Sequence, residues 1–62
     1  MFKEYTVNGK LVQCKDVPYY NGNGEYSVVV YYDDEYIGQI EKTSIHSRNF
    51  EQKLTKFVIE NV

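Results

Sequence analysis

The sequence predicts a small α+β fold, in which a four-stranded antiparallel sheet (a β-β-β-β-α meander) carries one C-terminal helix on one face. Three observations lead to this prediction. The pair Asn8-Gly9 lies between alternating apolar residues, which is the strongest short signal of a β-hairpin. Residues 28–32 are all β-branched or aromatic and favour a strand. After Ser47 the apolar spacing becomes helical.

The first hairpin follows from its turn. A type I′ turn at Asn8-Gly9 requires positive φ at both central residues and sets Val7 opposite Lys10. We expect the second strand to end near Pro18, because proline cannot donate a ladder hydrogen bond. This register gives one inward face the side chains of Tyr5, Val7, Val12 and Cys14.

A glycine-asparagine loop, residues 19–24, follows the second strand. It contains Tyr19 and Tyr20, which either form a mobile binding loop or fold back onto the sheet edge. The third strand is expected over residues 25–32 and the fourth over residues 36–42. A three-stranded sheet, with the first strand short or swapped, is the main alternative.

The turn between the last two strands decides which residues face the helix. A two-residue loop at Asp33-Asp34 would put Val28 opposite Gln39, whereas a loop that includes Glu35 puts Val28 opposite Ile40. A slip of one residue reverses the two faces of a strand. We favour the three-residue loop, with Gly38 beneath the helix, because its inner face is more apolar: Tyr26, Val28, Val30, Tyr36 and Ile40.

The C-terminal segment, residues 47–61, predicts an amphipathic helix. Asn49 and Gln52 have the spacing of a capping box, although Ser47 is an alternative cap. The helical stripe consists of Phe50, Leu54, Phe57, Val58 and Asn61.

The length of 62 residues predicts a single domain, residues 1–62, with a marginal core. One cysteine excludes an internal disulfide, and one histidine makes a structural zinc site very hard to build. We expect no cofactor and no metal. Cys14 is placed in the core and His46 in a loop, so we expect no catalytic pair and no enzyme activity. Oligomerisation remains open as a way to stabilise so small a core.

The sequence also predicts the cellular compartment of the protein. A single cysteine, an N-terminus without an apolar signal segment and the absence of a long apolar run indicate a cytoplasmic protein. The net charge is −2 with interspersed signs, which makes nucleic-acid binding unfavourable. The many Lys, Asn, Ile and Tyr residues have AT-rich codons and suggest an AT-rich bacterium or its phage.

The predicted function is protein binding, because one helix covers only one face of the sheet. An apolar patch rimmed by polar residues marks an interaction site. We predict that the patch binds another protein or a second copy, as a homodimer, through Val29, Tyr31, Ile37, Leu11 and Phe2. A secondary interface is predicted at Tyr19, Tyr20, Asp33, Asp34 and Glu35.

The alternative function is binding of single-stranded nucleic acid by the sheet tyrosines. Base stacking on aromatic side chains is worth about 1–3 kcal/mol per base and normally accompanies a basic groove. The basic residues available for it are Lys3, Lys10, Lys15 and Lys42.

Overall fold

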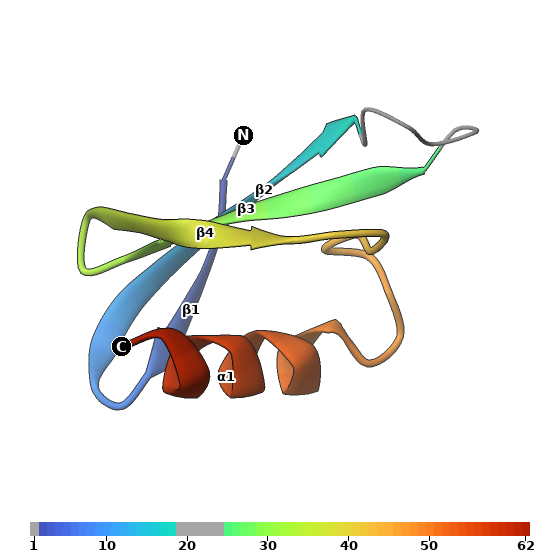
Figure 1. Ribbon diagram of the computed structural model, residues 1–62. Coiled ribbons are helices and arrows are strands. Elements are labelled where there is room, and N and C mark those ends of the chain that lie inside the picture. Colours follow the sequence, from blue (N-terminus) through green and yellow to red (C-terminus); the bar gives the residue numbers. More distant parts are fainter. Residues whose placement is uncertain (1, 19–24) are drawn as a thin grey trace.

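The structure, a computed structural model, describes residues 2–18 and 25–62 (Figure 1). It contains four strands, β1 (Lys3–Val7), β2 (Lys10–Pro18), β3 (Tyr26–Tyr32) and β4 (Glu35–Ile40), and one helix, α1 (Phe50–Asn61). The strands form one antiparallel sheet in the order β1-β2-β3-β4, and α1 lies along one face of it. The predicted four-stranded α+β fold is therefore confirmed. No helix among the described residues is long and apolar enough to cross a membrane.

The first hairpin has the predicted register. Asn8 and Gly9 adopt φ of 53° and 75°, as a type I′ turn requires, and Val7 pairs with Lys10. This register turns Val7, Val12 and Cys14 into the core. The local turn chemistry is thus sufficient to orient the first two strands.

The second tight turn differs from the prediction. Asp33 and Asp34 adopt φ of 51° and 68°, and Tyr32 pairs directly with Glu35. The connection is therefore a two-residue turn, and the predicted three-residue loop is wrong. The pairing of Val28 with Ile40 is nevertheless present.

A β-bulge reconciles this turn with that pairing. Val30 pairs with Gly38, but the next residue, Tyr31, pairs with Tyr36, so Ile37 is the extra residue of β4. Ile37 packs against the core cluster, while Tyr36 is 52% exposed and contacts Tyr31. The predictions that Ile37 belongs to the outer face and Tyr36 to the inner face are both wrong, because the bulge exchanges their roles.

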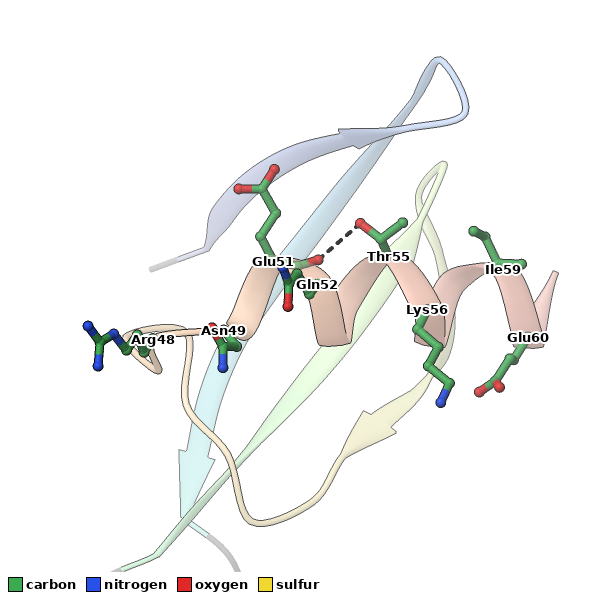
Figure 2. A pocket seen from close by; sticks show the side chains of 8 residues that line it. All are labelled: Arg48, Asn49, Glu51, Gln52, Thr55, Lys56, Ile59 and Glu60. Carbon is green, nitrogen blue, oxygen red and sulfur yellow. Dashed lines mark hydrogen bonds between the residues drawn. The ribbon is translucent and has the colours of Figure 1, made fainter.

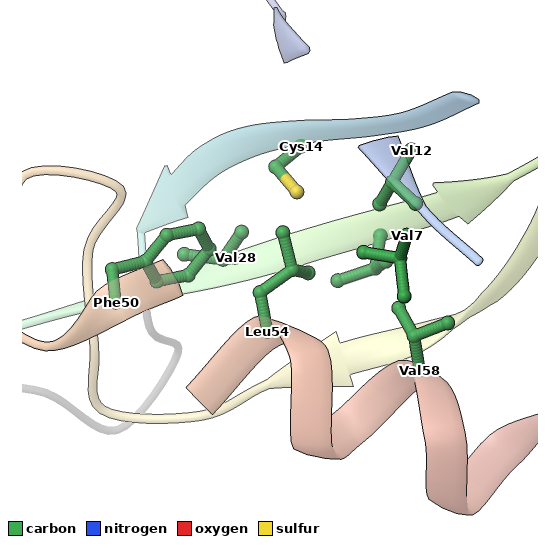
Figure 3. Close-up of a cluster of buried hydrophobic side chains, with 8 residues drawn as sticks. Val7, Val12, Cys14, Val28, Phe50, Leu54 and Val58 are labelled. Carbon is green, nitrogen blue, oxygen red and sulfur yellow. The ribbon is translucent and has the colours of Figure 1, made fainter. Parts of the chain in front are cut away.

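The core lies between the sheet and α1 (Figure 3). Phe50, Leu54 and Val58 are fully or almost fully buried and point from the helix toward the strands. They meet strand residues Val7, Val12, Cys14, Val28 and Val30. Tyr26, expected in this core, is 49% exposed at the first position of β3.

Gly38 permits the close approach of α1 to β4. A Cβ atom built on Gly38 would lie 3.0 Å from Cζ of Phe57, and the φ of Gly38 is +138°. Both the space and the backbone conformation at this position therefore favour glycine.

The segment between β4 and α1 is held by Asp16 of β2. The hydroxyl of Ser44 donates to Oδ2 of Asp16 at 2.7 Å, and the amide of Ile45 donates to Oδ1 at 2.8 Å. Asn49 occupies the N-cap position but makes no side-chain capping hydrogen bond, so the predicted capping box does not form. Oγ of Ser47 instead accepts from the Ser44 amide at 3.1 Å.

Candidate functional site

The sheet face turned away from α1 is the candidate site, and we call it the outer face. Its side chains alternate with those of the core, so Val29 and Tyr31 lie on it between the buried positions of β3. Both side chains are half-buried. The helix lies on the opposite side of the sheet (Figure 1), and no described element covers the outer face.

Three aromatic rings cross the outer face, and the middle ring, Tyr31, contacts both of the others. The Phe2 and Tyr31 rings lie 5.6 Å apart between centroids, and the Tyr31 and Tyr36 rings lie 5.5 Å apart. Both pairs meet edge to face, a favourable aromatic geometry. Phe2 is 45% exposed, so this aromatic row (Phe2, Tyr31 and Tyr36) remains open to a partner.

Polar and apolar neighbours extend the row. Leu11 is 41% exposed on β2. The Lys15 ammonium lies 5.8 Å from the Phe2 ring centroid, within the range of a cation–π contact. Gln13 Nε2 donates to Glu4 Oε2 at 3.4 Å. The outer face thus combines large apolar groups with a polar border.

The described members of the predicted interface fall into two groups. Phe2, Leu11, Val29 and Tyr31 lie on the outer face, whereas Ile37 packs with the core. Tyr36 belongs to the site, although the alternation of apolar residues in the sequence predicts it in the interior. Only the bulge brings Tyr36 there, and no local pattern in the sequence signals that bulge.

A cleft with side chains from both faces of the sheet lies at the edge where β1 begins. It has a volume of about 500 Å³ and is lined by Phe2, Lys3, Lys15, Asp16, Ile45 and His46. The Lys3 ammonium also lies 5.6 Å from the Tyr5 ring centroid. Both carboxylate oxygens of Asp16 accept hydrogen bonds from the neutral Ser44 hydroxyl and Ile45 amide, so the cleft holds one carboxylate beside its two lysines.

The acidic turn, Asp33, Asp34 and Glu35, lies at the other end of the sheet. The Asp33 amide donates to the Leu11 carbonyl at 2.8 Å, which places the turn beside the start of β2. Lys10 Nζ lies 3.8 Å from the Asp33 carboxylate, and both side chains are largely exposed. Tyr19 and Tyr20, the other members of the predicted secondary interface, lie outside the described residues.

The exterior of α1 does not form an enclosed site (Figure 2). The hollow there has a volume of about 820 Å³, but all of its lining residues come from the single segment 48–60. One helix and its preceding turn present a convex surface with no facing wall. Ile59, 57% exposed, is its large apolar side chain and makes this surface a useful control for the outer face.

The cysteine and the histidine of the chain differ in their exposure to solvent. Cys14 is fully buried, and desolvation by this burial raises the pKa of its thiol from 9.0 to about 11. His46 is exposed, and its backbone amide donates to the Ser44 hydroxyl at 3.1 Å. No group of three or more His, Cys, Asp or Glu residues positioned to hold a metal ion occurs within residues 2–18 and 25–62.

No family model, curated protein or solved structure matches this chain.

Proposed function

We propose that this chain is a non-catalytic protein-interaction module that binds a protein partner through the outer face. The observation that carries the proposal is the aromatic row, in which Phe2, Tyr31 and Tyr36 touch in sequence across the sheet. Tyrosine is enriched among the residues that dominate binding energy at protein interfaces. A ring that already packs against its neighbours loses little conformational freedom when a partner covers it.

The composition of the face supports a protein partner. The apolar rings lie beside Gln13, Glu4 and Lys15, which supply hydrogen-bonding and charged groups at the border. An apolar centre with a polar rim is the usual anatomy of a protein interface. The single reduced cysteine, Cys14, suits the cytosol, which is where we place this activity.

Binding of single-stranded nucleic acid is the second candidate, favoured by the same three rings. Two features make it the weaker one. The rings pack edge to face, at 84° and 61°, so the edge of one ring occupies a face of its neighbour that a base would need. The outer face also carries Glu4 as well as Lys15, which weakens attraction to phosphates. Fluorescence anisotropy with labelled oligonucleotides over a salt series tests it.

The test of protein binding uses two measurements on the same variants. Sedimentation over a dilution series detects self-association, and selection from a displayed peptide library detects binding to other sequences. Tyr31→Glu places a charge in the middle of the aromatic row, and Ile59→Glu places the same charge on the exterior of α1. We expect binding in at least one measurement that Tyr31→Glu abolishes and Ile59→Glu leaves intact.

The proposal fails if neither measurement detects binding by the wild-type chain. It also fails if Tyr31→Glu and Ile59→Glu behave alike while both retain the wild-type circular dichroism spectrum. Because Tyr31 is half-buried on the outer face, Tyr31→Ser serves as a second, milder variant if the glutamate prevents folding.

A further inference from the structure

We draw no further inference here: the strongest candidate, the outer face of the sheet with its aromatic row of Phe2, Tyr31 and Tyr36, belongs to the surface already described, and nothing in the structure shows what covers it.

Discussion

Substitution of Gly38 tests how closely α1 is seated on the sheet. In Gly38→Ala, the new Cβ would lie 3.0 Å from Cζ of Phe57, well inside the ordinary contact distance of 3.4–4 Å. The backbone is also at a φ of +138°, where a side chain is strained in any surroundings. The Phe57 ring would have to shift by a few tenths of an ångström to relieve the contact, whereas the backbone strain at Gly38 would remain.

The expected loss of unfolding free energy in Gly38→Ala follows from the backbone strain and the overpacking together. A residue held in a sparsely populated backbone region costs about 1–3 kcal/mol, and overpacking costs about 1–3 kcal/mol. Their sum, roughly 2–6 kcal/mol, is comparable to the ~3–5 kcal/mol that the core of so small a domain supplies. We expect Gly38→Ala to lose most of its free energy of unfolding, measured by urea denaturation followed by circular dichroism.

Two further variants isolate the contact with Phe57. Gly9→Ala also introduces a Cβ at positive φ, +75°, but meets nothing within 4 Å, so it should cost only about 1 kcal/mol. Phe57→Leu removes the Cζ atom, so the Gly38→Ala and Phe57→Leu substitutions should couple favourably by about 1–2 kcal/mol in a double-mutant cycle. Equal costs for Gly38→Ala and Gly9→Ala, together with no coupling, would refute the close approach of α1 to β4.

Three other predictions concern the bulge, the connecting segment and the buried thiol. Ile37→Ser should cost about 2 kcal/mol because Ile37 packs against the core, and Tyr36→Ser less than about 1 kcal/mol because Tyr36 is exposed; the reverse order in urea denaturation would contradict the bulge. Asp16→Ala should cost about 1–3 kcal/mol, since it removes the acceptors of Ser44 and Ile45, and hydrogen exchange should rise first at the Ile45 amide. Burial raises the pKa of the Cys14 thiol from 9.0 to about 11, so the contribution of the neutral thiol to stability is intact below pH 9 and is lost as the pH rises toward 11. The free energy of unfolding of Cys14→Ala should therefore fall less steeply between pH 9 and pH 11 than that of the wild type. Equal slopes of the two proteins would contradict the burial of the thiol.

The parts of the fold that were predicted correctly depend on nearby residues. The Asn8-Gly9 turn requires only the backbone freedom of two residues, and it determined the pairing of β1 with β2. The α1 stripe follows from helical spacing, so Phe50, Leu54 and Val58 could be assigned to the core in advance.

The candidate site was predicted only in part, for a reason that lies in β4. Phe2, Leu11, Val29 and Tyr31 were assigned correctly to the outer face, because the register of their strands follows from a tight turn or from strict alternation. The exchange of Ile37 for Tyr36 could not be predicted by alternation, since a bulge interrupts the period of two on which such predictions depend.

The sequence by itself determined the order of the elements, the first hairpin and the apolar face of α1, because each depends on residues within a few positions of one another. Only the tertiary structure showed how two conflicting demands on β4 are both met. The Asp33-Asp34 turn imposes a two-residue connection, whereas the core requires Val28 opposite Ile40. Satisfying both demands costs one extra residue, and the bulge that accommodates it determines which aromatic side chain joins the outer face.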